Sequence, residues 1–324
     1  CSNPRSDRAA ARMSSGTRIE FATTRLPSVL PSYLRILWPR SGKGIKSGSQ
    51  LPRIATSWRS ATFDERHLER YCEMCALPAN VPGSPVPILY PHTYLGPLHL
   101  ALMTHDAVPL GLLGSLHLRN HIIQYKPLRA DTIFDVHMAI DGGRLRPQGM
   151  EIDLTTRIEV DGERVWTSIS TFLVRQRPGD DAVVDAVSPL AASVGSISGE
   201  FEPVGTFPIP ASTGIAFGLL TKDVNPIHTS LVAAKFFGFE RDLVHGMWGL
   251  GRALGLLKGV VDAARPIRLD CAFKGPMYME RDVQVRRAGD AFELYSGDNP
   301  RPSLVGRMVN VDNAAQVGGQ RARL

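Results

Sequence analysis

The segment Asp223-Val-Asn-Pro-Ile-His228 holds residue types that could move protons. A carboxylate and an imidazole that converge on one water molecule make a general acid/base unit. Pro226 fixes its own φ and disfavours the helical conformation at Asn225, so the chain turns sharply between Asp223 and His228. An Asn-Pro turn with a helix-capping Asp and a surface His would use the same residue types. The segment alone therefore leaves both interpretations open.

The residues on either side of this segment narrow the choice. Phe217 precedes it by a few residues, and His245-Gly246-Met247 follows it. This arrangement resembles the MaoC-like, or (R)-specific enoyl-CoA hydratase, family, whose motif is an aromatic residue, then Asp-x-Asn-Pro-x-His, then His-Gly-Met. The first half of the chain is similar too. Its stretch Arg119–Leu128 resembles one in long-chain members with two fused hot-dog units, such as the mycobacterial 3-hydroxyacyl-thioester dehydratases.

The resemblance implies a role for each matching residue. Asp223 and His228 match the family's catalytic pair, and Asn225 matches the residue that supports them. The N–H of Gly246 matches the backbone donor of the oxyanion hole. One position departs from the family, because Lys222 stands where many members have Gly. The substrate-binding residues that the resemblance implies are Phe217, His245 and Met247.

The implied reaction is that of a hydro-lyase acting on fatty acyl thioesters of CoA or acyl-carrier protein. It hydrates trans-2-enoyl thioesters reversibly, or dehydrates (R)-3-hydroxyacyl thioesters, in fatty acid metabolism. Water adds a hydroxyl to C3 and a proton to C2 while negative charge builds on the thioester oxygen. A carboxylate and an imidazole can transfer the protons, and an N–H at a helix start can meet the oxyanion. We expect no metal and no redox cofactor, because neither step calls for one.

Two other functions fit the same fold. The first is a non-catalytic acyl-thioester-binding hot-dog protein, against which the intact Asp223 and His228 argue. The second is a hot-dog thioesterase, which would cleave the thioester. That class commonly relies on a carboxylate at the hot-dog helix, and the sequence has none between Gly246 and Val261. Both alternatives stay open, with the hydratase favoured.

Helices followed by strands are predicted twice along the chain. Residues 124–133 also echo residues 272–283, each with an aromatic residue and Lys, then Pro, then Asp. This repetition favours a duplicated unit. With the resemblance it predicts an α+β double hot-dog, in which curved antiparallel strands wrap a long helix in each unit. The predicted helices are 65–77, 93–103, 212–220 and 246–258, and the predicted strands are 114–125, 131–140, 150–160, 164–174, 267–273, 283–287, 291–295 and 304–311, with turns at 141–143 and 161–162.

The composition divides the chain into four parts. Residues 1–56 mix Pro, Gly, Ser and Arg, and we expect a mobile basic tail there, with one apolar patch at 34–38 that could dock as a short helix. Residues 57–175 should form a non-catalytic hot-dog unit that makes room for the acyl chain. Residues 176–205 lack periodicity and predict a linker. Residues 206–324 should form the catalytic unit.

Charge and cysteine content bound the remaining possibilities. The first 60 residues hold eleven Lys and Arg against two acids, so the other residues carry a net charge of −3 and predict no basic nucleic-acid-binding face. No apolar stretch is long enough to span a membrane. Cys72 and Cys75 share a predicted helical face and are expected to be buried thiols. We expect a cytoplasmic protein that is a monomer or a homodimer.

Overall fold

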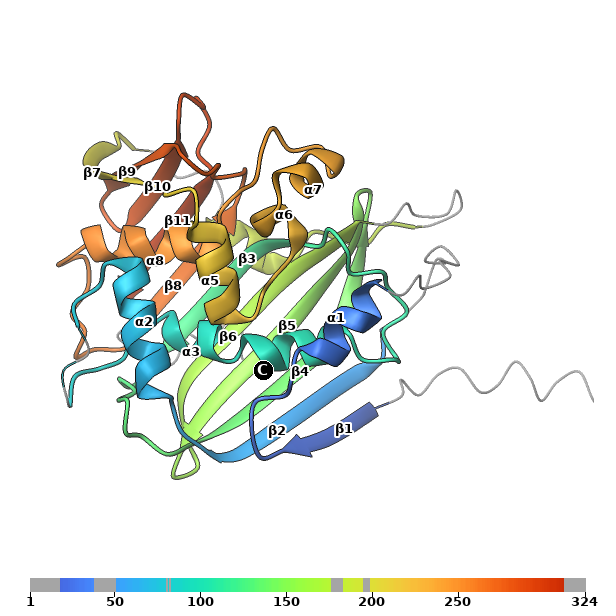
Figure 1. Ribbon diagram of the computed structural model, residues 1–324. Helices are drawn as coiled ribbons and strands as arrows, with labels where there is room; N and C mark the ends of the chain where they lie inside the picture. The colour runs from blue at the N-terminus through green and yellow to red at the C-terminus, as the bar shows by residue number, and fades with distance from the viewer. Residues whose placement is uncertain are drawn as a thin grey trace, which may run out of the picture.

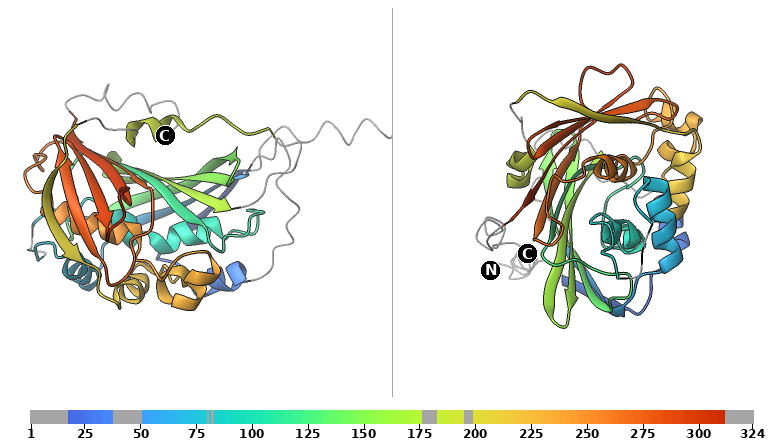
Figure 2. Two further views of the ribbon diagram at one scale, coloured as in Figure 1. Left: turned by 90° about the horizontal axis from the view of Figure 1, so that it is seen from above. Right: turned by 90° about the vertical axis from the view of Figure 1, so that its left-hand side faces the viewer.

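The computed structural model describes residues 18–37, 51–79, 81, 83–175, 183–194 and 199–311 (Figure 1). All the named strands belong to one sheet of eleven, in the order β1-β2-β4-β5-β6-β3-β8-β11-β10-β9-β7. The sheet curves around the α-helices, which lie on its inner face, while the segment that contains η1 (Pro189–Val194) runs over the outer face (Figure 2). Among the residues that the structure describes, no helix is long and apolar enough to cross a bilayer.

Each half of the chain contributes five strands in the same order of elements, and β1 (Arg18–Thr23) and α1 (Leu30–Leu37) precede them. The first half comprises β2 (Arg53–Ala61), α2 (Glu65–Cys75), α3 (Tyr90–Tyr94), α4 (Gly96–Met103), β3 (Leu116–Gln124), β4 (Phe134–Arg146), β5 (Gly149–Val160) and β6 (Glu163–Arg175). The second comprises β7 (Glu202–Pro208), α5 (Thr213–Thr221), α6 (Pro226–Thr229), α7 (Leu231–Phe236), α8 (Gly246–Leu256), β8 (Ile267–Phe273), β9 (Asp282–Ala288), β10 (Ala291–Ser296) and β11 (Leu304–Asn310).

The two halves join where β3 pairs with β8. The strands are antiparallel, with Arg119 opposite Ala272 and Gln124 opposite Ile267. At the middle of this seam the His121 Nδ1 lies 2.9 Å from the Asp270 Oδ1, and both side chains are buried. The architecture is the expected α+β double hot-dog. Two units thus share one continuous sheet, which fixes the position of the helices of one unit relative to those of the other.

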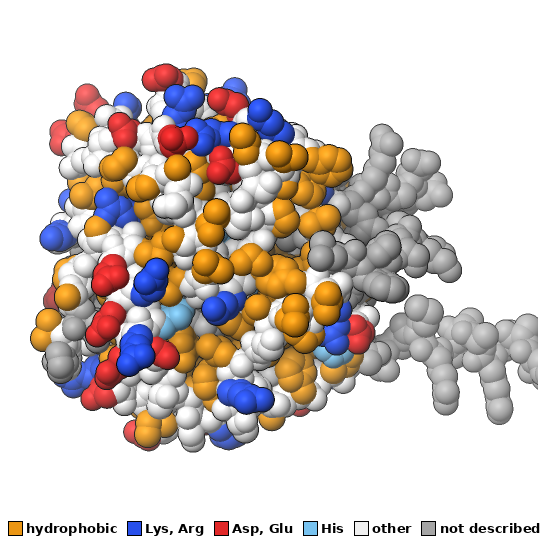
Figure 3. All heavy atoms as spheres, viewed as in Figure 1, with side chains coloured by type: hydrophobic (Ala, Val, Ile, Leu, Met, Phe, Trp, Pro, Cys, Tyr) orange, Lys and Arg blue, Asp and Glu red, His pale blue; other side chains and the backbone are white. Residues whose placement is uncertain are grey.

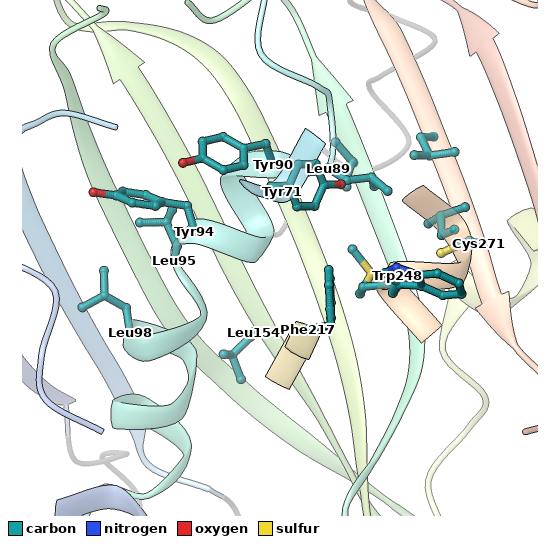
Figure 4. Packing of buried hydrophobic residues seen from close by; sticks show 14 of the residues in the cluster. Tyr71, Leu89, Tyr90, Tyr94, Leu95, Leu98, Leu154, Phe217, Trp248 and Cys271 are labelled. Carbon is teal, nitrogen blue, oxygen red and sulfur yellow. The ribbon is translucent and has the colours of Figure 1, made fainter. Parts of the chain in front are cut away.

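The inner face of the sheet and the helices enclose one large apolar core. Tyr71, Tyr90 and Leu98 of the first unit and Phe217 and Trp248 of the second belong to the same buried cluster (Figure 4). The predicted helix 93–103 is divided into α3 and α4 at Leu95, which is followed by Gly96 and Pro97. Because the core is continuous across the two units, the units support each other's helices.

Part of the predicted tail belongs to the fold. Residues 18–23 form β1, which pairs in parallel with β2, and residues 30–37 form α1. The expectation of a mobile tail over 1–56 is therefore wrong for these residues and for the start of β2. Each strand at the edge of a sheet offers unpaired N–H and C=O groups, and β1 satisfies those of β2. The predicted short helix at 34–38 is confirmed through residue 37. Residues 38–50 lie outside the described residues.

Two further predictions are corrected by the strands. The Asp-Gly-Gly sequence at 141–143 is no turn: β4 continues through it with a register shift between Ile140 and Gly143, and the hairpin turns where Arg146 pairs with Gly149. The predicted linker also overlaps β7, which starts at Glu202. The turn at Asp161 and Gly162 is confirmed, with φ of 51° and 76°. Cys72 and Cys75 are buried free thiols, as predicted.

Glycines in α8 allow α2 to approach closely. A Cβ at Gly251 would lie 2.8 Å from the Cys75 Sγ, whereas the nearest atom to a Cβ at Gly255 is 3.4 Å away. We expect Gly251→Ala to lower the free energy of unfolding by about 1–3 kcal/mol through overpacking. Gly255→Ala should be neutral or stabilising, because Ala favours the helix. Denaturant unfolding of both variants measures the difference, and equal stabilities would contradict this packing.

Candidate active site

Residues from both units surround one cavity of about 450 Å³. It lies between α4 of the first unit and the loop between α5 and α6 of the second, and α1 also borders it. All seven residues that the sequence analysis assigned to the site line this cavity. The second unit contributes Phe217, Thr221, Lys222, Asp223, Val224, Asn225, Pro226, His228, His245, Gly246 and Met247, and the rest of the chain contributes Tyr33, Ile36, His92, Thr93, Gly96, His99, Leu100, Met103, Leu112, Leu113, Gly114, Ser115, His117 and Phe172.

Helix α5 brings the loop that follows it into place. Lys222 ends the helix with a φ of 61°, a left-handed conformation that glycine adopts more easily. This explains why many family members have Gly at that position. The loop then folds back against α5, since a Cβ at Gly218 would lie 2.7 Å from the Asp223 carbonyl oxygen. At Gly214 the corresponding distance to the His228 carbonyl oxygen would be 2.1 Å. Only a helix without side chains at these positions can lie this close to the loop.

Asn225 and Pro226 turn the chain from Asp223 toward His228. The Asn225 N–H donates to the Asp223 Oδ1 at 3.3 Å, and the Asn225 Oδ1 accepts from the Ile227 N–H at 3.4 Å as the N-cap of α6. Pro226 is the first residue of that helix, a position whose N–H has no partner within the helix, so the missing N–H of proline costs no hydrogen bond. The backbone N–H and the side-chain oxygen of Asn225 thus both make hydrogen bonds within the turn. The Asp223 side chain remains 55% exposed, so its carboxylate is accessible.

Two imidazoles lie beside this carboxylate. The rings of His228 and His245 stack with centroids 3.8 Å apart, and one polar atom each of Asp223, His228 and His245 lie within 4.8 Å of one another. A backbone carbonyl only accepts, so the His228 Nδ1 donates to the Leu243 oxygen at 2.8 Å. The His245 Nε2 donates in the same way to the Asp223 carbonyl oxygen at 2.9 Å. These bonds fix one tautomer for each ring and leave a lone pair on the His228 Nε2.

The surroundings keep both rings uncharged. Removal from water, together with the neighbouring His245, lowers the pKa of His228 well below its ordinary value. Burial also lowers the pKa of His245, although the Asp223 carboxylate opposes this. Among the residues that the structure describes, these three side chains are close enough together to hold a metal ion. Their hydrogen bonds use one nitrogen of each imidazole.

Gly246 is the first residue of α8, where the positive end of the helix dipole lies. Its N–H belongs to the first turn and has no acceptor within the helix. A Cβ at this position would lie 2.4 Å from the Phe273 ring of β8, so glycine is required for α8 to pack on the sheet. The N–H and the cavity are thereby brought together. Substitution of Gly246 would disturb helix packing as well as the donor.

The remaining predicted residues shape the wall of the cavity. Phe217 is 1% exposed and its ring centroid lies 5.4 Å from that of His245. Met247 places its sulfur 3.8 Å from the Asn120 Nδ2, across the boundary between the units. Phe217 therefore packs beside His245, Met247 contacts the first unit, and both side chains line the cavity.

The first unit contributes residues that the sequence analysis did not assign to the site. His92 and His99 are buried at the cavity, with ring centroids 4.7 Å apart. His117 lies on β3, within the predicted strand 114–125, and it also borders the cavity. The spacing of these histidines in the sequence does not predict a site, because they come together only where helices α3 and α4 pack on strand β3. Tyr33 was missed because it lies in the predicted tail.

Comparisons with known proteins agree with this arrangement. Residues 195–289 match the family model described as MaoC like domain. The matching residues include the loop from Asp223 to His228 and the start of α8. The similarity to this family therefore lies in the second unit. The chain is also 27% identical over 241 residues to 3-hydroxyacyl-thioester dehydratase X of Mycobacterium tuberculosis, covering 71% of this chain and 78% of that protein.

Solved structures share the fold of both units. The crystal structure of HtdX of Mycobacterium tuberculosis superimposes with a TM-score of 0.66 at 23% identity, covering 79% of this chain and 100% of that one. A MaoC-like dehydratase from Phytophthora capsici gives a TM-score of 0.57 at 18% identity, with coverage of 82% and 96%. Similarity over both units supports the same double architecture.

The buried histidines predict how stability depends on pH. Burial lowers the pKa of His92 to about 4, and it lowers the pKa of His99 well below its ordinary value. In the unfolded chain these rings gain protons as pH falls below about 6.5, whereas in the folded protein they stay unprotonated. The free energy of unfolding therefore decreases as pH decreases below about 6.5. We expect a lower melting temperature at about pH 5.5 than at about pH 7.5, and a smaller difference for His99→Gln. Equal melting temperatures for the wild type would contradict the prediction.

Proposed function

We propose that this protein catalyses the reversible hydration of trans-2-enoyl thioesters to (R)-3-hydroxyacyl thioesters in fatty acid metabolism. The observation that carries the proposal is the meeting of Asp223, the uncharged His228 and the N–H of Gly246 at one cavity. The similarity to a 3-hydroxyacyl-thioester dehydratase supports it. The acyl group would be carried by CoA or acyl-carrier protein. Location in the cytoplasm and the state of monomer or homodimer stay predictions from the sequence.

Proton transfer would start from a water molecule held between the carboxylate and the imidazole. As the water oxygen bonds to C3, its proton would pass to the lone pair of the His228 Nε2. The electrons of the C2–C3 double bond would move toward the thioester oxygen as the O–C3 bond forms. The resulting imidazolium, stabilised by Asp223, would then return its proton to C2. A low pKa suits this cycle, because the ring starts uncharged and gives the proton back readily.

The N-terminus of α8 would stabilise the charge that develops on the thioester oxygen. The Gly246 N–H is a preorganised donor at the start of a helix, so it would meet the developing charge without reorganisation. The neighbouring Phe273 ring, which fixes the packing of α8 on β8, would hold this donor in place. Acid/base groups and donor would thus act on opposite ends of the same conjugated system.

The acyl chain would extend into the part of the cavity that the first unit lines. Leu100 and Met103 from α4 and Ile36 from α1 contribute apolar side chains there. The α4 helix carries no acidic residue, so the first unit offers no carboxylate from its own hot-dog helix. We infer one active site in each chain, with the first unit selecting the acyl chain.

The central prediction concerns the catalytic pair. Asp223→Asn and His228→Gln should each remain folded and lose hydration activity toward a trans-2-enoyl-CoA by roughly a hundredfold or more. Because both groups act on one water, the double variant should lose less than the product of the single losses. Loss of the enoyl absorbance measures hydration, and release of free thiol measures thioesterase activity.

Matched controls separate the site from general effects of the substitutions. Asp262→Asn and His137→Gln make the same changes outside this cavity and should keep wild-type turnover. Hydration that survives in a folded Asp223→Asn variant would refute the proposed site and leave the binding protein as the interpretation. Thiol release without hydration would point to the thioesterase.

A second prediction tests the role of the first unit. Leu100→Trp should narrow the cavity and lower kcat/KM for long-chain enoyl-CoA by roughly tenfold or more relative to a four-carbon substrate. Leu100→Ala should shift the preference toward longer chains. A series of enoyl-CoA chain lengths measures the ratio. Equal losses on all chain lengths would mean that this part of the cavity does not hold the acyl chain.

A further inference from the structure

Helix α1 attaches to both units at the border of the cavity. Its outer face carries Leu30 and Leu34, which are 65% and 60% exposed, and Figure 3 shows apolar side chains gathered on this face over α1, α5 and α7. Its inner face holds the attachment. The buried Ser32 accepts a hydrogen bond of 2.9 Å from the Thr104 hydroxyl at the end of α4, and Ile36 borders the cavity. These inner-face contacts orient the helix against both units.

Tyr33, on this inner face, makes two hydrogen bonds to the catalytic loop. Its hydroxyl donates to the Lys222 carbonyl oxygen at 2.7 Å and accepts from the Val224 N–H at 2.7 Å. These two backbone groups flank Asp223 on either side. Burial, followed by the charge of Asp223, raises the pKa of the Tyr33 phenol, so it keeps the proton that it donates. One hydroxyl thus fixes both neighbours of the catalytic carboxylate.

The loop needs such a partner at this point. Lys222 has already left the α5 helix in a left-handed conformation, and Asn225 starts the next turn, so the backbone between them belongs to no helix or strand. The His245 imidazole holds the Asp223 carbonyl from the core side. Tyr33 holds the adjacent peptide groups from the outer side. The Asp223 N–H also donates to the Thr221 hydroxyl at 3.2 Å. Without Tyr33, the Lys222 carbonyl and the Val224 N–H would turn to water, and the backbone on both sides of the carboxylate would lose its hold from the outer side.

We propose that Tyr33 is a positioning residue for Asp223, supplied by a segment that precedes the first hot-dog unit. Its hydroxyl orders the catalytic loop from outside while His245 orders it from inside. The proposal rests on the hydratase activity proposed above, since it concerns the same carboxylate. It also gives α1 a function beyond covering the cavity.

The test compares Tyr33→Phe with Tyr94→Phe in the full chain. Tyr94 offers a matched control, because its buried hydroxyl also donates to a backbone carbonyl, that of Thr62, at 3.0 Å. Neither residue belongs to the loop, and Tyr94 does not line the cavity. Tyr33→Phe should lower kcat for a four-carbon enoyl-CoA by about tenfold with little change in KM. It should also speed amide hydrogen exchange in a peptide spanning residues 221–230. Tyr94→Phe should change neither quantity, whatever it does to the melting temperature.

Each outcome decides the proposal. Unchanged hydrogen exchange in Tyr33→Phe would overturn it, and so would faster exchange with an unchanged kcat, since the hydroxyl would then not position the carboxylate. Equal losses of kcat in both tyrosine variants would indicate a general effect on stability and would also overturn it. If the wild-type protein hydrates no enoyl-CoA, the proposed function fails by itself, and hydrogen exchange still decides whether Tyr33 orders the loop.

Discussion

The pairing of β3 with β8 is the interaction on which the site depends. It joins the sheets of the two units with a fixed register, from Arg119 opposite Ala272 to Gln124 opposite Ile267. Because the sheet is continuous, α4 of one unit and the loop from Asp223 to His228 of the other are held on opposite sides of one cavity. Neither unit could form that cavity alone. In the proposed function, the acyl-binding wall and the proton-transfer groups would thus come from different halves of the chain.

Hydrogen bonds to the backbone position Asp223, the exposed residue to which the proposal assigns proton transfer. The Asp223 carboxylate stays accessible, while the peptide groups around it are held by the His245 imidazole and the Tyr33 hydroxyl. His228 is oriented through the Leu243 carbonyl in the same way. Because these bonds hold the backbone, the Asp223 carboxylate stays exposed and the His228 Nε2 keeps its lone pair. The loop around Asp223 can therefore be ordered while the carboxylate stays exposed.

Local chemistry explains what could be predicted from the sequence. The catalytic loop has its own turn residues, and α8 and β8 to β11 carry clear periodicity, so they were predicted closely. Edge strand β7 was missed because most of its residues are exposed and show no alternation. Residues 141–143 look like a turn, but the length of β5 opposite them makes β4 continue. Tyr33 and His99 were missed because their roles arise only from contacts between segments far apart in sequence.

The most direct test of the account is a structure of Asp223→Asn with a bound trans-2-enoyl-CoA. The account predicts the thioester oxygen within hydrogen-bond distance of the Gly246 N–H, at about 2.9 Å. It predicts C3 facing the His228 Nε2 across one water molecule, and the acyl chain between α1 and α4. A thioester bound in that cavity with its oxygen away from α8, or an acyl chain bound outside the cavity, would contradict it.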